Sequence, residues 1–205
     1  MKLHGHPLSS CTRKVLVTLA EKGAKAELSV VDLLAGEHRG PAHVARHPFA
    51  MIPVLEDEGF VLYESRAILR YLDRKLPGVS LVPRDTREIA RMDQWLSVDQ
   101  SYVAPHVSAL VAERVVKPKL GGPADAERIS GAEAGLSRAL GVLDAALRES
   151  PFLAGEAFSL ADISLMPYVA ALPLVGADAL IGGVPNVARW WERVSSRPSW
   201  AAAIR

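Results

Sequence analysis

The chain has 205 residues, which is enough for one long domain or for two compact domains of unequal size. Hydrophobic residues make up 49% of it and charged residues 23%, and this composition excludes a mainly disordered chain. The 24 Lys and Arg residues nearly balance the 23 Asp and Glu residues, so the net charge is +1. Because neither sign forms long runs, we expect no nucleic-acid partner and no membrane partner.

The sequence favours a cytoplasmic protein. Polar residues and Pro7 interrupt the first ten positions, so we expect no cleaved secretory signal. The longest uncharged stretch, 163–177, is too short to cross a bilayer. Cys11 is the single cysteine, so no internal disulfide can form, as suits a reducing compartment.

The first elements in chain order predict a β-α-β unit. A short strand over 1–4 is followed by a loop and by a helix whose apolar pattern begins after Ser9 and ends at Gly23. Alternating residues over 26–33 predict a second strand. Two strands joined through a helix are expected to be parallel.

A hairpin and a helix follow. Two apolar runs, 52–55 and 60–63, flank a polar turn over 56–59, and an amphipathic helix is predicted over 67–76. Beyond it the pattern is helical only, over roughly 87–116, 124–149, 160–172 and 185–195. We therefore expect an α/β domain at 1–77 (βαβ, then ββα), a linker at 78–86 and an all-α domain at 87–205.

The loop before the first helix is a candidate anion site. Ser9 and Ser10 lie where backbone N–H groups are unpaired and the helix dipole is positive. A thiol with a pKa near ~8.5 would be shifted toward its thiolate there, with Ser9 as the hydroxyl donor. In the simpler interpretation, Ser9, Ser10 or Thr12 only caps the helix.

Two other segments can also be interpreted either as part of a binding site or as purely structural. Pro53 precedes a strand; a cis bond would turn the backbone sharply there, whereas an ordinary trans proline at a strand start is the more frequent case. Ser65 lies where the hairpin leads into a helix, and it either binds a carboxylate or acts as an N-cap beside a solvated Arg66.

One motif indicates a role in folding and not a role in catalysis. Ser159 and Asp162 have the spacing of a capping box at the start of an apolar helix, and Asp162 is expected to be buried. The six histidines lack the paired spacing of a zinc site, so we expect no metal. The common sequence motifs of nucleotide-binding proteins, metalloproteases and α/β-hydrolases are absent from the sequence.

Taken together, five segments resemble the cytosolic glutathione transferases, most closely the phi class: 5–23, 31–57, 62–72, 152–168 and 185–200. The resemblance implies a thioredoxin-like first domain and a helical-bundle second domain. It implies an enzyme that joins glutathione, as co-substrate, to a small hydrophobic electrophile. It also implies a homodimer, with Phe49 and Arg66 at the contact between subunits.

The resemblance also assigns roles to residues. Ser9 would donate its hydroxyl to the glutathione sulfur, and Ser10 would assist it. The residues that would hold the rest of the tripeptide are His38 and Arg39 at the glycine carboxylate, Ile52 before a cis Pro53 at the cysteinyl part, and Glu64 and Ser65 at the γ-glutamyl end. An electrophile pocket between the domains would be lined by Pro7, Leu8, Leu34, Tyr102, His106 and Leu110, although the last three are equally well interpreted as core.

Three departures keep alternatives open. Met51 stands where the phi pattern has a glutamine, so one side-chain hydrogen bond to glutathione would be missing. The trio Ser9-Ser10-Cys11 also resembles the zeta class, which implies a glutathione-dependent isomerase. Cys11 on the first helical turn would suit a glutathione-dependent disulfide reductase. The fold also serves in non-catalytic binding modules.

Overall fold

The computed structural model describes residues 1–204 and divides into two compact units. The first unit contains Met1–Val82 together with residues 196–204, and the second contains Pro83–Ser195. The division falls inside the segment expected as a linker. Residues 196–204, in contrast, group with the first unit, whereas the sequence analysis placed them in the helical domain.

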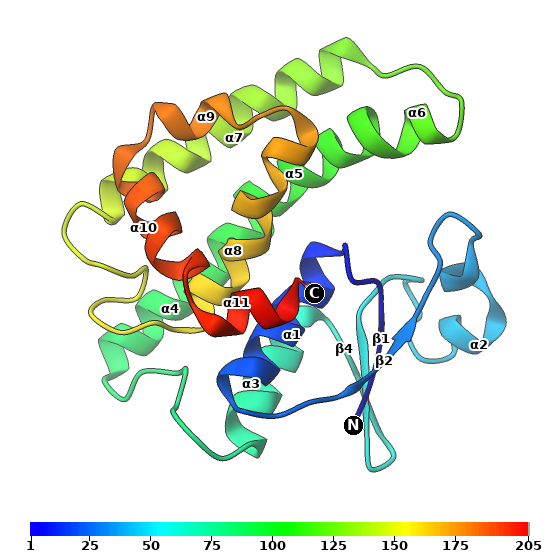
Figure 1. The fold of residues 1–205 in the computed structure, drawn as a ribbon, viewed down its shortest axis with the longest axis horizontal. Helices are drawn as coiled ribbons and strands as arrows, with labels where there is room; N and C mark the ends of the chain where they lie inside the picture. Colours follow the sequence, from blue (N-terminus) through cyan, green and yellow to red (C-terminus); the bar gives the residue numbers. More distant parts are fainter. Residues whose placement is uncertain (205) are drawn as a thin grey trace. The chain divides into compact units, whose positions relative to one another are not determined.

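The first unit is built on a four-stranded mixed sheet (Figure 1). Its strands lie in the order β2-β1-β3-β4 and have the bounds β1 Lys2–Gly5, β2 Glu27–Val30, β3 Val54–Asp57 and β4 Phe60–Tyr63. As predicted, β1 and β2 are parallel, and β3 runs antiparallel to both β1 and β4. The α/β class expected for this part of the chain is confirmed.

Helices complete the first unit. Between β2 and β3 the chain forms a 3₁₀ turn over Glu37–Arg39 and the short helix α2 over Pro41–Val44. The longer helices α1 (Ser10–Glu21) and α3 (Ser65–Lys75) pack against each other. The core contains apolar side chains with no exposed surface, among them Leu3, Val15, Leu55, Ile68 and Leu69.

The hairpin turn is tighter than predicted. Strand β3 continues through Asp57, so that only Glu58 and Gly59 form the turn between β3 and β4. Their φ angles are 52° and 87°. Two positive φ angles suit the right-handed twist of the flanking strands, and this explains why the turn needs only two residues.

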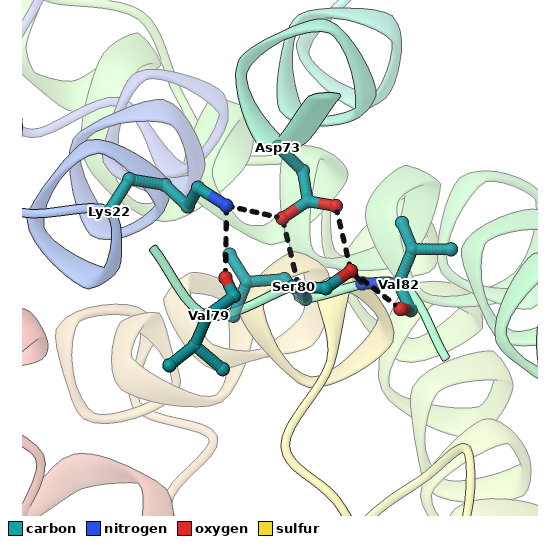
Figure 2. Close-up of polar contacts among 6 residues, drawn as sticks. Lys22, Asp73, Val79, Ser80 and Val82 are labelled. Atoms are coloured by element: carbon teal, nitrogen blue, oxygen red, sulfur yellow. Dashed lines mark hydrogen bonds and ion pairs between the residues drawn. The ribbon is translucent and has the colours of Figure 1, made fainter. Parts of the chain in front are cut away.

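Two long-range polar contacts stabilise the first unit. Arg197 donates from Nε and Nη2 to both carboxylate oxygens of Glu21 at 2.7 and 2.8 Å, just before α11 (Pro198–Ala203). Figure 2 shows the second contact, in which Lys22 Nζ lies 3.1 Å from Asp73 Oδ1 and donates to the carbonyl of Val79. The same Oδ1 accepts from Leu81 N–H at 2.8 Å. The first contact joins the end of α1 to the residue before α11. The second joins the end of α1 to α3 and to the residues that follow α3.

The second unit is all helical, as predicted. Its α-helices are α4 Thr86–Val98, α5 Ala104–Val111, α6 Lys117–Lys119, α7 Ala126–Ala146, α8 Leu160–Ala171, α9 Ala179–Gly182 and α10 Pro185–Ser195. A 3₁₀ turn over Pro173–Val175 follows α8. The central helix of this unit is α8 (Figure 1). Its residues 160–169 are all buried. Across residues 1–204, no helix combines the length and apolar character needed to span a bilayer.

The long helical pattern of 87–116 is interrupted twice. Five-residue π-helical segments lie at Asp99–Val103 and Ala112–Val116, and each is followed within two residues by a proline, Pro105 or Pro118. Proline has no N–H, and its ring clashes with the carbonyl four residues earlier. A wider π turn accommodates this without ending the helix.

The predicted capping box at α8 is present. Ser159 Oγ accepts from Ala161 N–H, and Asp162 Oδ2 accepts from Ser159 N–H at 3.0 Å. Asp162 is 0% exposed, and its Oδ1 also accepts from Leu153 N–H and Trp190 Nε1. Burial raises the pKa of this carboxyl, while the four donated hydrogen bonds favour its charged form. Asp162 thus joins three segments of the second unit.

Candidate functional site

The strand register brings the predicted glutathione-binding segments to one edge of the sheet. His4 near the end of β1 pairs with Val54 at the start of β3, and Val54 pairs with Tyr63 at the end of β4. The exits of β1 and β4 and the entry to β3 therefore lie side by side. The start of α1, the Ile52–Pro53 bond and the start of α3 are placed at this edge.

The start of α1 leaves its positive end open. Ser9 is the N-cap and is half-buried, and its Oγ accepts from Thr12 N–H at 3.3 Å. The first turn of α1 contains no acidic residue. Arg13 Nε donates to the carbonyl of Pro7 at 2.8 Å, which shapes the loop. The Ser9 hydroxyl acts as acceptor in this bond, so its hydrogen is not used by it and can be donated to a ligand.

The residues beside Ser9 are placed on the first helical turn. Ser10 is the first residue of α1 and Cys11 the second, and both are half-buried. Thr12, in contrast, is 0% exposed. Its Oγ1 accepts from His6 N–H, and a Cβ on Gly5 would come within 2.5 Å of it. Thr12 therefore packs β1 against α1, whereas Ser9, Ser10 and Cys11 are each partly exposed.

The Ile52–Pro53 peptide bond is cis, as the resemblance implied. Met51, before it, is 61% exposed, and Ala50 has a φ of +53°, a value that L-residues other than glycine seldom adopt. The carbonyl of Met51 is 2.7 Å from His43 Nε2. His43 is a contact that the sequence analysis did not identify.

The start of α3 differs from that of α1, because its N-cap residue makes no side-chain hydrogen bond to the helix. Glu64 is the N-cap, is exposed and has a φ of +68°, so its backbone also has an uncommon conformation. Ser65 is the first residue of the helix and is 4% exposed. Positive φ angles at non-glycine residues are concentrated at functional sites. A ligand carboxylate at this helix start would meet N–H groups and the Ser65 hydroxyl.

His38 and Arg39 lie in the 3₁₀ turn after β2, whose exit is also at this edge because β2 is parallel to β1. Burial, together with the charges of Arg39 and His43, lowers the pKa of His38. His38 is consequently neutral at pH 7. Arg39 is exposed, so it is the cation available to a carboxylate in this turn.

The predicted pocket residues differ in accessibility. In the first unit Leu8 is 66% and Leu34 is 56% exposed, and Pro7 is half-buried. In the second unit Tyr102 is 61% exposed, whereas Leu110 is 0% exposed. The ring of His106 lies against Gly135 of α7, so close that a Cβ there would be 2.2 Å away. Leu110 thus fits the interpretation as a core residue better than the pocket role, whereas His106 is half-buried and packs on α7.

An aromatic cluster surrounds the predicted subunit contact. Phe49 is 72% exposed, and its ring lies edge-on to His47 and Tyr63. The His47 ring is 2% exposed and lies 4.5 Å from that of Tyr63. Arg66, the other predicted contact residue, is half-buried.

The second unit contains a hollow that no prediction covers. In the second unit a hollow of about 290 Å³ lies between the end of α7 and α10, lined by Arg148, Asn186, Arg189, Trp190 and Arg193 among others. None of these residues has a predicted role. Within residues 1–204, no group of three or more His, Cys, Asp or Glu side chains is arranged to hold a metal ion.

Comparison with known proteins gives a consistent result. Residues 8–75 match the family described as glutathione S-transferase, N-terminal domain, and residues 101–198 match the corresponding C-terminal domain. Glutathione S-transferase F10 of Arabidopsis thaliana is 38% identical over 95% of this chain and 92% of its own length.

Solved structures agree with this comparison. Glutathione transferase F7 from Populus trichocarpa superposes with a TM-score of 0.92 at 36% identity, covering 100% of this chain and 99% of its own. Glutathione S-transferase I from maize, solved with an atrazine glutathione conjugate, superposes with a TM-score of 0.87 at 29% identity, covering 99% and 97%.

Proposed function

The chain belongs to the glutathione S-transferase family, and from this premise we propose that Ser9 stabilises the thiolate of glutathione for attack on small apolar electrophiles. One observation carries the proposal. The open start of α1, the Ile52–Pro53 bond and the start of α3 lie at one edge of the sheet. A tripeptide placed there would meet hydroxyl, main-chain and helix-terminal groups together.

The thiol is ionised by local electrostatics. The Ser9 hydroxyl donates a hydrogen bond to the sulfur, and the positive end of α1 favours the negative charge. The proton leaves to solvent. With an aryl halide the thiolate forms a carbon–sulfur bond, the carbon–halogen bond breaks, and halide departs with the bonding electron pair.

The remaining parts of glutathione are held by separate groups. Arg39 binds the glycine carboxylate, with His38 as a neutral neighbour. The main chain of Ile52 pairs with the cysteinyl part, and Glu64 and Ser65 hold the γ-glutamyl end. Met51 offers no amide, which would weaken glutathione binding by about 1 kcal/mol relative to a glutamine.

Leu8 and Leu34 present the apolar surface that an electrophile would contact, since both are more than half exposed. Tyr102, in the second unit, is 61% exposed, and its contact with the electrophile stays a prediction. We also propose a cytoplasmic homodimer with the exposed Phe49 at the contact between subunits. An apolar ring that is 72% exposed in one chain is well suited to burial by a second copy.

Cys11 supports the second candidate function, a glutathione-dependent disulfide reductase. It lies on the first turn of α1, two residues after Ser9, and is half-buried. In this reaction the Cys11 thiolate would attack a mixed disulfide of glutathione and a substrate thiol, so that the substrate thiolate leaves and Cys11 becomes bound to glutathione. A second glutathione thiolate then attacks this bond, releases Cys11 and leaves as oxidised glutathione. The isomerase and non-catalytic alternatives have no comparable observation.

One set of assays separates these functions. Wild type, Ser9→Ala and Cys11→Ser are compared in conjugation of a generic aryl halide and in reduction of hydroxyethyl disulfide, with calorimetry of glutathione binding. We expect Ser9→Ala to lose roughly 10²-fold in conjugation, the scale seen when one hydrogen-bond donor to a developing anion is removed, and Cys11→Ser to retain it. Conjugation that survives in Ser9→Ala and disappears in Cys11→Ser would transfer the catalytic role to the cysteine.

A further inference from the structure

His43 makes a directed contact with the segment that the proposed function uses. It lies on the short helix α2, is 6% exposed, and its Nε2 is 2.7 Å from the carbonyl oxygen of Met51. A carbonyl oxygen can only accept a hydrogen bond, so Nε2 carries a proton and donates it. The contact joins two segments eight residues apart.

This contact determines the direction of the next N–H group. The Met51 carbonyl and the Ile52 N–H belong to one planar peptide unit and point in opposite directions. A hydrogen bond that holds the carbonyl therefore also orients the N–H. The backbone of Ile52 is the group assigned above to the cysteinyl part of glutathione.

Few other groups in the surrounding loop can fix the direction of the Ile52 N–H. Ala50 is in the left-handed region at φ +53°, which is unfavourable for an L-residue, so the loop conformation has to be maintained by its contacts. The side chain of Met51 is 61% exposed and adds little packing. His47, four residues after His43, is occupied by its ring contact with Tyr63.

We propose that His43 is a positioning residue for glutathione binding: through the Met51 carbonyl it holds the Ile52 N–H in the direction that receives the tripeptide backbone. The inference rests on the proposed function, because it concerns the same site. His43 touches no reacting atom. Its loss would weaken glutathione binding and leave the chemical step unchanged.

Two amide substitutions of different length test this. The amide nitrogen of His43→Gln reaches about the place of Nε2, whereas that of His43→Asn is shorter by one methylene and does not reach the Met51 carbonyl. His43→Phe keeps the ring volume and removes the donor. Val44→Ala, on the same helix, measures the effect of lost packing alone.

We expect His43→Asn and His43→Phe to raise the KM for glutathione roughly fivefold, the equivalent of one hydrogen bond, with kcat and the KM of the electrophile within about twofold of wild type. His43→Gln should recover most of the affinity, and Val44→Ala should resemble wild type. Calorimetry of glutathione binding gives the same comparison without turnover, and thermal unfolding confirms that each variant is folded.

The outcomes separate this inference from the proposed function. If wild type does not bind glutathione at millimolar concentration, the proposed function itself fails. If wild type binds but the Asn and Phe variants bind equally well, His43 has no positioning role. The same conclusion follows if Gln and Asn are impaired to the same extent, or if kcat falls while the KM for glutathione is unchanged.

Discussion

Two helices in this protein begin with a serine N-cap, and they use it in opposite ways. At α8, Ser159 is 1% exposed, and a carboxylate of the same chain, Asp162, fills the helix start. At α1, Ser9 is half-buried, and no acidic residue stands in the first turn. At α8 a carboxylate of the chain itself complements the helix dipole, whereas the first turn of α1 supplies none.

The largest expected effect comes from removing the carboxylate that lies at the start of α8. Asp162→Ala removes the acceptor of four hydrogen bonds in a site without solvent, so we expect it to lower the free energy of unfolding by about 3–5 kcal/mol. Urea unfolding followed by tryptophan fluorescence measures this. Asp85→Ala at the exposed N-cap of α4 is the control, with an expected loss of about 1 kcal/mol. Equal losses in the two variants would contradict the buried role of Asp162.

A paired substitution of the two serines should separate folding from catalysis. Ser159→Ala is expected to cost about 2 kcal/mol of stability, since it loses bonds to both Ala161 N–H and Asp162. Ser9→Ala should cost about 1 kcal/mol or less, because one bond at 3.3 Å is lost at a partly solvated position. Measured per folded molecule, conjugation should persist in Ser159→Ala and fall in Ser9→Ala. If conjugation fell in Ser159→Ala and persisted in Ser9→Ala, the catalytic role assigned to the start of α1 would be wrong.

The smallest expected effect on stability comes from adding a carboxylate at the start of α1. Ser10→Asp adds a carboxylate to the first turn of α1, and we expect it to stabilise the helix by about 0.5 kcal/mol. The same charge opposes the thiolate, so the pH profile of conjugation should move upward by about one unit, which is roughly 1.4 kcal/mol of differential interaction. Ser10→Asn is the neutral control. Identical pH profiles for the two variants would mean that the α1 terminus does not act on the sulfur.

Features that depend on nearby residues were predicted well. The strand over 1–4, the helix after Ser9 and the helix over 185–195 follow from apolar periodicity, and the structure has β1, α1 and α10 at these places. The capping box of Ser159 and Asp162 was identified from its spacing because both of its bonds lie within one turn. The cis bond before Pro53 came from the resemblance, since periodicity alone left the trans form open.

Features that depend on distant residues were not predicted. Residues 196–204 join the first unit through the contact of Arg197 with Glu21, across 176 positions, and no local pattern indicates such a partner. The pairing of Lys22 with Asp73 spans 51 positions. His43 was counted among scattered histidines, because its contact is with a main-chain carbonyl and a backbone acceptor leaves no trace in the sequence.

The sequence by itself determined the types of helix and strand, the two-part organisation and the family, because these depend on residue periodicity and on ordered motifs. Only the tertiary structure decided that Asp162 accepts from Trp190, that His106 lies against Gly135, and that His43 holds the Met51 carbonyl. The physical reason is range: capping and periodicity act within a turn or two of chain, whereas packing and hydrogen bonding between elements depend on which surfaces the whole fold brings into contact.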